Sequence, residues 1–322
     1  MLSSVIKIVF RRLISALALA WLLSACGFVL AQAPLTIEQE PKSYPFTFAA
    51  YGDMRTTDPG NHRETDPEVR AVLERQIARE KPDLLFIGGD LVLNGGDAND
   101  WAVFDQETRP LRDAGITIFP ALGNHDVRGG PHALDYFFQR FPQLQDHRWY
   151  SVHYGNCLFL VLDSDVDHKA GSPQGEWLES ELKGVTPDID FVFLVMHHPP
   201  ITHSSTEMGG HSVREEEKQM PAYLEQHQAK MRARLVVIAG HVHNYERYWQ
   251  NGVMYLVSGG GGAEPYKVHR DKRDFYNQPG PAYHYCTFQV ERGRLRFQMH
   301  KLDMAKGQAR WSLGDSFELK VK

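Results

Sequence analysis

The segment LVVIAGHVHNYE, residues 235–246, begins with an unbroken apolar run and then presents two histidines one residue apart. Such a run is typical of a buried strand. Gly240 therefore marks the end of the strand, and His241 and His243 follow directly. If the segment stays extended, alternate side chains point to the same side, so both imidazoles face one way. This pair suits a metal ion, although two loop histidines with local hydrogen bonds would produce the same pattern.

Four further predicted strands run from apolar residues into a polar end. Ligands of α/β proteins bind outside the carboxyl ends of strands, so these polar side chains meet in one crevice if the strands share one sheet. A single Gly-Asp or Asn-His-Asp is usually a turn or a loop. Five strand ends that supply Asp, Asn and His, which are ligands of metal ions, are hard to explain by chance. The segments FTFAAYGD, PDLLFIGGD, ITIFPALGNHD and DFVFLVMHHPP supply Asp53, Asp90, Asn124, His125, Asp126, His197 and His198.

Helical patterns alternate with these strands. Residues 66–80 have a capping residue, Asp66, and place Pro67 at the first helical position. Strands that alternate with helices, followed by a strand-rich end, predict an α/β domain with a mixed sheet or two packed sheets. Further helices are predicted over residues 99–115 and 173–184, and over 213–231 on either side of Pro221. A hairpin is predicted over 149–165 and a long irregular loop at about 269–284. Two late strands are predicted over 283–293 and 294–303.

Residues 1–31 have the composition of an export signal. Three basic residues accompany an apolar run over about residues 13–30, and no acidic residue precedes Glu38. Cleavage after Ala31 would remove residues 1–31, whereas the lipobox-like LSAC would remove residues 1–25 and leave a lipidated Cys26. We therefore predict an exported bacterial protein, either periplasmic or anchored in the membrane as a lipoprotein. A linker over residues 32–44 and one domain over residues 45–322 would follow.

Charge and cysteine content limit the possible classes. The chain has 322 residues and a formal net charge of −5, so no basic surface points to nucleic-acid binding. Cys157 and Cys286 each lie in a predicted strand. Export permits a disulfide between them, but isolated strand cysteines are also typical of small buried hydrophobic residues, and the sequence does not decide.

The polar strand ends, taken in order, resemble the motifs of the calcineurin-like metallophosphoesterase superfamily, most closely its purple acid phosphatase-like branch. The segments RWYSVHYGNCLFLVLDS, QGEWLESEL and GHVHNYER are similar to segments of that branch, and the resemblance covers about residues 45–300. It implies an αββα sandwich of two mixed sheets flanked by helices, with two metal ions that are Fe, Mn or Zn. By the resemblance, Asp53 and His243 would bind the first ion, and the second would be bound by Asn124, His197 and His241. Asp90 would bridge the two ions. His125, oriented by Asp126, would stabilise the transition state or protonate the leaving oxygen.

Arg55 departs from the family pattern, which commonly has a histidine two residues after the first aspartate. Purple acid phosphatases instead have a tyrosine three residues after the bridging aspartate, where this chain has Leu93. Arginine stays protonated and cannot ligate a metal ion. Three explanations remain open: the first ion has an open position and binds weakly, His62 reaches in from its loop, or Arg55 contacts the substrate phosphate. An exposed loop arginine without a role is the fourth.

These features predict a metallophosphoesterase that hydrolyses a phosphomonoester or phosphodiester of a small phosphorylated substrate by means of a metal-activated hydroxide. The alternative, favoured only by Arg55, is a non-catalytic or single-metal binding protein on the same scaffold. In similar proteins the loop over residues 197–211 faces the substrate. The residues expected to contact the substrate are Arg55, His62, His198 and His211.

Overall fold

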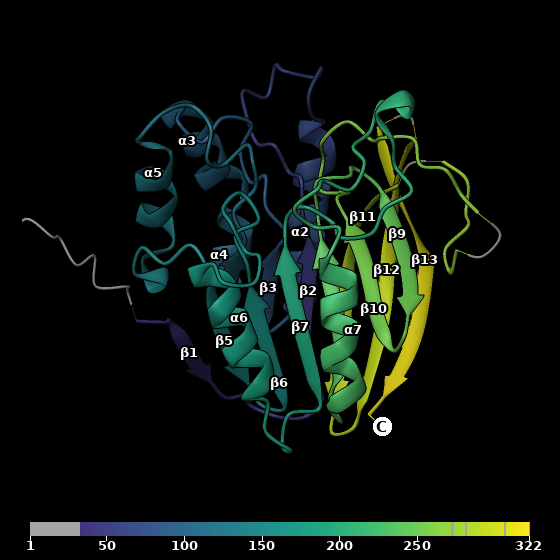
Figure 1. Cartoon of the computed structure of the whole chain (residues 1–322). Helices are drawn as coiled ribbons and strands as arrows, with labels where there is room; N and C mark the ends of the chain where they lie inside the picture. The colour runs from purple at the N-terminus through teal and green to yellow at the C-terminus, as the bar shows by residue number, and fades with distance from the viewer. Residues whose placement is uncertain (1–32, 272–273, 281, 306, 322) are drawn as a thin grey trace, which may run out of the picture. The chain divides into compact units, whose positions relative to one another are not determined.

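Two mixed β-sheets lie face to face in the unit that spans Leu35–Lys322. The computed structural model describes residues 33–271, 274–280, 282–305 and 307–321 (Figure 1). The predicted export signal and Cys26 lie outside the described residues. Among the residues that are described, no helix is long and apolar enough to cross a membrane.

The first sheet has seven strands and the second has six. Strands β6, β7, β8 and β10 are parallel in the first sheet, and β2, β3 and β4 are parallel in the second. The order in the first sheet is β1 (Thr36–Gln39), β5 (Tyr150–Tyr154), β6 (Cys157–Val161), β7 (Phe191–Met196), β8 (Arg234–Ala239), β10 (Val253–Ser258) and β9 (Tyr245–Gln250). The order in the second is β13 (Gln308–Lys320), β12 (Arg294–Ala305), β11 (Tyr283–Glu291), β2 (Phe46–Tyr51), β3 (Leu84–Ile87) and β4 (Thr117–Pro120).

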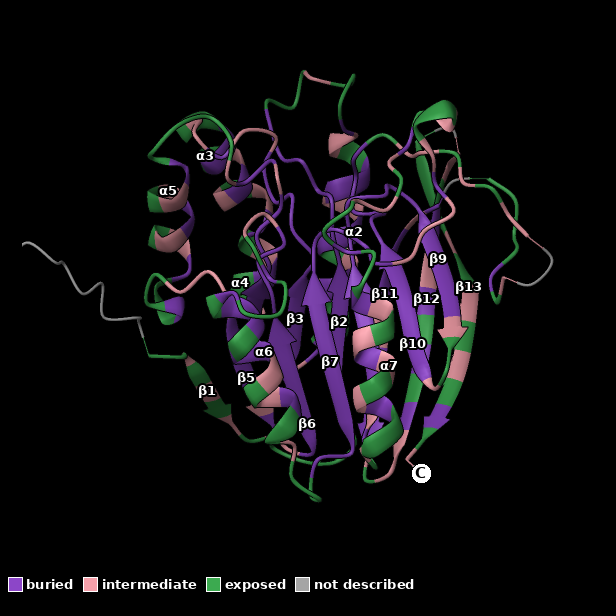
Figure 2. Cartoon of the chain, in the orientation of Figure 1, coloured by how far each residue is buried: buried purple, intermediate pink, exposed green. Residues whose placement is uncertain are grey.

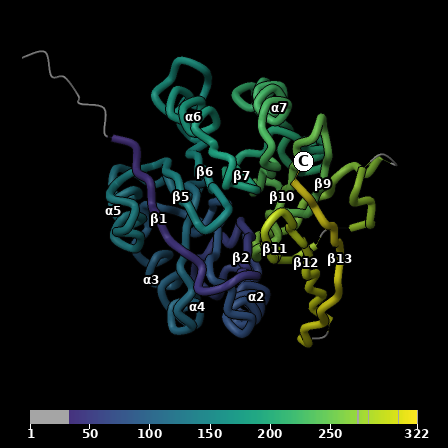
Figure 3. The backbone as a smooth tube through the Cα atoms, turned by 90° about the horizontal axis from the view of Figure 1, so that it is seen from below, coloured from purple at the N-terminus to yellow at the C-terminus, as the bar shows by residue number. Residues whose placement is uncertain are grey.

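Helices cover the outer faces of both sheets, which gives the predicted αββα sandwich. Figure 3 shows α6 and α7 on one side of the paired sheets and α2 and α4 on the other. The helices are α2 (Pro67–Glu80), α3 (Ala98–Glu107), α4 (Arg109–Asp113), α5 (Ala133–Arg140), α6 (Pro173–Lys183) and α7 (Met220–Lys230). Short 3₁₀ turns cover Pro142–Leu144 and Thr206–Met208.

Aromatic side chains fill the space between the sheets. The Phe48 ring of β2 stacks on Phe288 of β11, with centroids 4.4 Å apart. It also contacts Phe159 of β6 and Phe193 of β7 edge-on, at 5.0 and 4.8 Å. Central strands are therefore buried along their whole length, as Figure 2 shows for β7 and β10. A second apolar cluster joins the outer face of the first sheet to α6 and α7 through residues such as Leu178 and Leu224.

Several local predictions are confirmed. The Asp66 carboxylate accepts hydrogen bonds from the backbone N–H groups of Glu68 and Val69, both at 3.0 Å, and Pro67 begins α2. The hairpin of β5 and β6 turns at Gly155, which has a φ of +57°. The sequence left the state of the cysteines open, and the structure shows Cys157 and Cys286 as buried free thiols.

Other predictions were wrong. Residues 36–39, within the predicted linker, form β1, which pairs in parallel with β5. A third late strand, β13, follows β12 as an antiparallel partner. The helix predicted on both sides of Pro221 begins only at Met220, because proline fits the first turn of a helix but not its interior. The segment after His243, for which no element was predicted, forms strand β9.

Candidate metal centre

The predicted ligands follow strands of two sheets and not of one shared sheet. Asp53 and Asp90 follow β2 and β3 of the second sheet, and His197 and His241 follow β7 and β8 of the first. The two sets meet directly, because the backbone N–H of His241 donates to Asp53 Oδ2 at 2.8 Å.

Glycines at these strand ends allow the sheets to approach. A Cβ atom on Gly240 would lie 2.5 Å from the carbonyl oxygen of Gly88 and 2.7 Å from Asp53 Oδ2. Any larger residue would therefore push the ends of β3 and β8 apart. The Gly-Gly-Asp and Gly-His motifs thus have a packing reason in addition to a chemical one.

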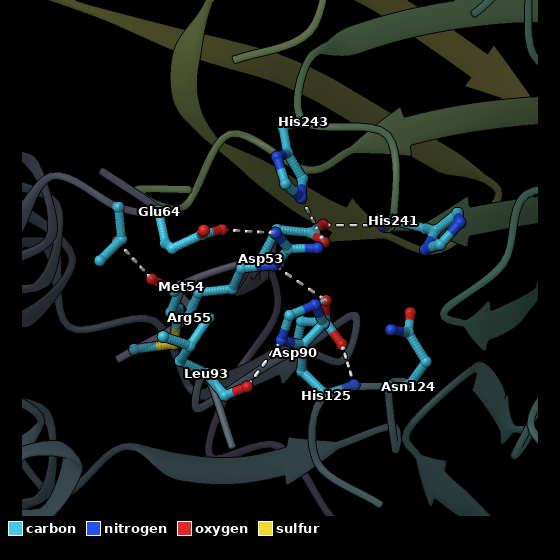
Figure 4. Close-up of polar contacts among 12 residues, drawn as sticks. Asp53, Met54, Arg55, Glu64, Asp90, Leu93, Asn124, His125, His241 and His243 are labelled. Carbon is cyan, nitrogen blue, oxygen red and sulfur yellow. Dashed lines mark hydrogen bonds and ion pairs between the residues drawn. The ribbon is translucent and has the colours of Figure 1, made fainter. Parts of the chain in front are cut away.

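The backbone at the centre adopts conformations that are rarely populated. Asp53, Asp90 and His241 have φ values of +62°, +55° and +67°, and Arg55 has +46°. Left-handed backbone costs a non-glycine residue of order 1–3 kcal/mol and persists only where the surroundings impose it. Here it turns the side chains of successive strand ends toward one point, as Figure 4 shows for Asp53 and Asp90.

Three candidate ligand atoms gather around the Nε2 atom of His197. Its Nε2 atom lies 3.1 Å from Asn124 Oδ1, 3.2 Å from His241 Nδ1 and 3.3 Å from Asp90 Oδ1. Its Nδ1 atom lies 2.9 Å from the carbonyl oxygen of Gly88. A carbonyl oxygen can only accept, so Nδ1 carries the proton and Nε2 presents a lone pair. Nε2 of His197 and the three atoms around it form a group that we call the His197 position. The three are Asn124 Oδ1, His241 Nδ1 and Asp90 Oδ1.

The spacing of the His197 position fits a metal ion. Ligand atoms about 2.0–2.1 Å from one ion lie roughly 2.9–3.4 Å from one another in octahedral or tetrahedral arrangements. The observed separations of 3.1–3.3 Å fall within this range. Oxygen and imidazole nitrogen ligands together suit Fe, Mn or Zn.

Two further buried acceptor atoms, one of Asp53 and one of His243, face each other without a hydrogen-bond donor between them. Asp53 Oδ1 and His243 Nε2 are 3.6 Å apart, both are buried, and neither has a hydrogen-bond partner. The Nδ1 atom of His243 lies 2.7 Å from the carbonyl oxygen of Glu264, so Nε2 again presents a lone pair. Two facing lone pairs repel each other unless a cation lies between them. We call these two atoms the Asp53 position.

Burial keeps the imidazoles in the neutral form that a metal ion requires. It lowers the pKa values of His197, His241 and His243 below the usual range. Burial and the neighbouring Asp90 raise the pKa of Asp53. For Asp90, the effect of burial is outweighed by His197, His125 and Arg55, which lower its pKa. Adjacent buried carboxyls and neutral imidazoles form a cluster in which a cation is strongly favoured.

The His125 side chain lies beside the cluster. Its Nδ1 atom donates to the carbonyl oxygen of Leu93 at 2.7 Å, and its Nε2 atom accepts from the Arg128 guanidinium at 2.8 Å. Its Nε2 is 3.9 Å from Asp90 Oδ2. Burial, with the charges of Arg55 and Arg128, lowers the pKa of His125 to about 4. His125 is therefore neutral at physiological pH.

The sequence predicted that Asp126 orients the His125 ring, and this prediction is wrong. The carbonyl of Leu93 holds that ring instead. The Asp126 carboxylate accepts from four backbone N–H groups, those of Asp90, Leu91, Val92 and Gly123, at 2.8–3.2 Å. It therefore ties the loop after β4 to the loop after β3. These two loops carry Asn124 and Asp90.

The residues expected to contact the substrate have different fates. His211 lies over His241, with ring centroids 4.3 Å apart, and its Nε2 meets the Tyr266 hydroxyl at 3.2 Å. His198 also packs on His241, but its nitrogens bind Ser164 and Arg214. His62 is exposed and, within the described chain, has no hydrogen bond or ion pair with the cluster. The explanation in which His62 reaches in is therefore wrong.

Arg55 is buried, so the interpretation as an exposed loop arginine is also wrong. Its side chain is only 8% exposed, and its Nε donates to Asp90 Oδ2 at 3.3 Å. Two further residues of the site, Tyr266 and Arg128, belong to no motif that the sequence analysis identified. Tyr266, from the loop after β10, stacks on His243 with centroids 4.0 Å apart. Arg128 lies three residues after His125, but only the structure shows its bond to that ring.

Comparison with known proteins yields one family match. A protein-family profile described as calcineurin-like phosphoesterase matches residues 46–245, a segment that contains every atom of both metal positions. "Probable purple acid phosphatase 20" of Arabidopsis thaliana is 26% identical over 259 residues, which cover 74% of this chain and 56% of that protein. "Probable inactive purple acid phosphatase 1" of the same plant is 25% identical over 271 residues, which cover 70% and 44%.

A solved structure has the same fold. A purple acid phosphatase from seeds of yellow lupin (Lupinus luteus) superposes with a TM-score of 0.65 at 21% sequence identity. The superposition covers 87% of this chain and 54% of the lupin chain. The chain spans about half the length of the curated relatives reported above.

Proposed function

Since the chain belongs to the calcineurin-like phosphoesterase family and is a distant homologue of purple acid phosphatases, we propose that it is a metal-dependent phosphoesterase. It would hydrolyse a phosphomonoester or phosphodiester of a small molecule. The observation that carries this proposal is the pair of buried lone-pair clusters at the His197 and Asp53 positions. A purely structural role does not explain why Asp53 Oδ1 and His243 Nε2, two buried acceptors without hydrogen-bond partners, face each other.

The two positions assign the metal-binding residues. Asp90, Asn124, His197 and His241 would hold an ion at the His197 position, and Asp53 and His243 would hold an ion at the Asp53 position. Bound metal ions neutralise the charge of a phosphate ester and lower the pKa of water so that it can act as a nucleophile near neutral pH.

His125 and Arg128 would act on the substrate from the side of the cluster. Arg128 is exposed, and within the described chain it forms no ion pair with a carboxylate, so its guanidinium is available to a phosphate oxygen. When Arg128 turns to the phosphate, His125 Nε2 becomes free to hold or move a proton. The hydrogen bond from Nδ1 to the carbonyl oxygen of Leu93 fixes the ring, so that Nε2 faces the reacting groups.

The His125→Ala variant tests this proposal. We expect hydrolysis of p-nitrophenyl phosphate or bis-p-nitrophenyl phosphate to fall about 10²–10⁴-fold, while metal content per chain stays unchanged. The protein is stripped with a chelator and reloaded in turn with Mn, Zn and Fe before each assay. His132→Ala is the matched control, because His132 is exposed and lies on the surface at the start of α5. Wild-type protein that hydrolyses neither ester with any of the metals would refute the proposal.

A non-catalytic or single-metal binding protein is the second candidate. Arg55 favours it, because this buried guanidinium bonds the carboxylate that the family resemblance gives a bridging role. The name of one relative includes "inactive". The same metal-loaded assay separates the two candidates, since the binding protein would retain metal but show no turnover.

We also propose that the protein is exported, on the basis of the composition of residues 1–31. A periplasmic enzyme and a lipoprotein anchored through Cys26 differ in their mature N-terminus. Mass spectrometry of the mature N-terminal peptide distinguishes cleavage after Ala31 from lipidation at Cys26. An unprocessed N-terminus would argue against both.

A further inference from the structure

The two oxygens of Asp90 face different partners. Oδ1 accepts from the backbone N–H of His125 at 2.9 Å and lies 3.3 Å from His197 Nε2, so it belongs to the His197 position. Oδ2 accepts from Arg55 Nε at 3.3 Å. A carboxylate that bridges two metal ions gives one oxygen to each. In this chain a guanidinium takes the oxygen that the second ion would use.

Arg55 is held firmly in this place. Its backbone N–H donates to the carbonyl oxygen of Asp90 at 2.9 Å, and its φ of +46° turns the side chain toward that residue. A second carboxylate, Glu64, lies 4.0 Å from the guanidinium (Figure 4). The pair with Asp90 is buried, so removal of either partner would leave an uncompensated charge.

The two positions are therefore unequal in ligands and in charge. The His197 position has four protein ligand atoms, whereas the Asp53 position has two that are free, Asp53 Oδ1 and His243 Nε2. The Arg55 guanidinium lies at the buried carboxylate of Asp90, with its Nε 3.3 Å from Asp90 Oδ2, and Arg55 follows Asp53 by only two residues. A fixed positive charge that close repels a metal cation. The smaller set of ligand atoms, together with this charge, weakens binding at the Asp53 position more than at the His197 position, which has four ligand atoms.

We propose that Arg55 replaces one of the two metal ions. The protein binds one ion tightly at the His197 position, and Arg55 supplies the positive charge on the other side of Asp90. A second ion binds at the Asp53 position about 100-fold more weakly. This inference rests on the metal centre in the proposed function, but it concerns metal stoichiometry and not turnover.

Metal binding in Arg55 variants tests the proposal. We expect wild-type protein to retain about one Mn²⁺ per chain after gel filtration. The Arg55→His variant removes the charge and adds a ligand, so it should retain about two. Arg55→Ala should bind the second ion at least about tenfold more tightly than wild type. Elemental mass spectrometry gives the stoichiometry. Electron paramagnetic resonance separates isolated Mn²⁺ from the exchange-coupled signal of two neighbouring ions.

Two controls distinguish a specific effect from general damage. Arg55→Lys keeps the positive charge and should stay at about one tight ion. Arg128→Ala removes a guanidinium that contacts His125 and no carboxylate, and its stoichiometry should also stay at one. Circular dichroism verifies that each variant is folded. If Arg55→His does not fold, Arg55→Ala takes its place as the test of the proposal.

Two tight ions in wild-type protein would overturn the proposal, and so would a folded Arg55→Ala variant that binds the second ion no better. Failure of the proposed function gives a different result. A chain with one tight ion and no turnover would refute the phosphoesterase activity and leave the role of Arg55 intact.

Discussion

Asp126 illustrates how much of the site depends on single side chains that touch neither metal nor substrate. Its carboxylate accepts four backbone N–H groups from two loops. Charge-assisted hydrogen bonds of this kind are about twice as strong as neutral ones. The short sequence GNHD therefore contains a proposed ligand, Asn124, a proposed proton-handling group, His125, and a structural clamp, Asp126.

Asp165 gives a prediction about the pH dependence of stability. Its Oδ2 atom is buried without a hydrogen-bond partner, and burial together with the charge of Asp163 raises its pKa to about 7. An unfolded aspartate loses its proton near pH 3.9. Between about pH 4 and 7 the native state thus binds a proton that the unfolded state releases, and this group reduces stability as the pH rises.

The Asp165→Asn variant, which mimics the protonated form, should unfold at a higher temperature than wild type at pH 8. The two proteins should have equal melting temperatures at pH 4, because the wild-type carboxyl is then protonated as well. Scanning calorimetry at both pH values measures the difference. Asp167→Asn is the control, since Asp167 is exposed two residues away. A difference of the same size at both pH values would show that folding does not raise the pKa of Asp165.

At the scale of elements, the ends of β3 and β8 must touch for the centre to form. Gly240→Ala leaves the backbone conformation allowed but places a methyl group 2.5 Å from the Gly88 oxygen and 2.7 Å from Asp53 Oδ2. Overpacking of this kind typically costs about 1–3 kcal/mol. We expect a lower melting temperature, and metal affinity reduced at least about tenfold because the two sets of ligands move apart.

Gly184→Ala is the matched control for this element. Gly184 ends α6 with a φ of −79°, and a Cβ atom there would have its nearest neighbour at 3.2 Å. Its metal affinity should equal that of wild type in the same titration. Wild-type metal affinity in Gly240→Ala would mean that the strand ends can separate without loss of the centre.

At the scale of the whole molecule, the two sheets are joined by aromatic packing far from the metal centre. Phe48 is fully buried and contacts rings from both sheets. Phe48→Ala should reduce the free energy of unfolding by about 3–5 kcal/mol, the usual cost of a large cavity in a core. Denaturant titration measures this loss. Below the transition, the variant should retain the wild-type metal stoichiometry, because Phe48 contacts no ligand.

Leu313→Ala is the corresponding surface control. Leu313 is 57% exposed on β13, so its truncation should change the free energy of unfolding by less than about 0.5 kcal/mol. If Phe48→Ala cost no more than this control, the interface between the sheets would not be the main source of stability.

The sequence alone predicted the features that depend on neighbours along the chain. Apolar runs that end in Gly-Asp, Asn-His-Asp or Gly-His predicted β2, β3, β4, β7 and β8, because strand formation and its termination are local. The order of these motifs was sufficient for the family resemblance, which the profile over residues 46–245 confirms. The Asp66 cap and the turn at Gly155 were also predictable, since both need only a few adjacent residues.

Tertiary structure alone decided what depends on residues far apart in the chain. β1 was missed because its partner, β5, is more than one hundred residues away and its only apolar side chain is Ile37. Nothing near Asp126 or Arg55 in the sequence reveals that the first binds two loops and that the second is buried against Asp90. Hydrogen bonds and burial at such positions arise only when the ends of two sheets meet. The sequence therefore determined which candidate ligands the chain carries, and the packing of the sheets decided where Arg55 places its charge among them.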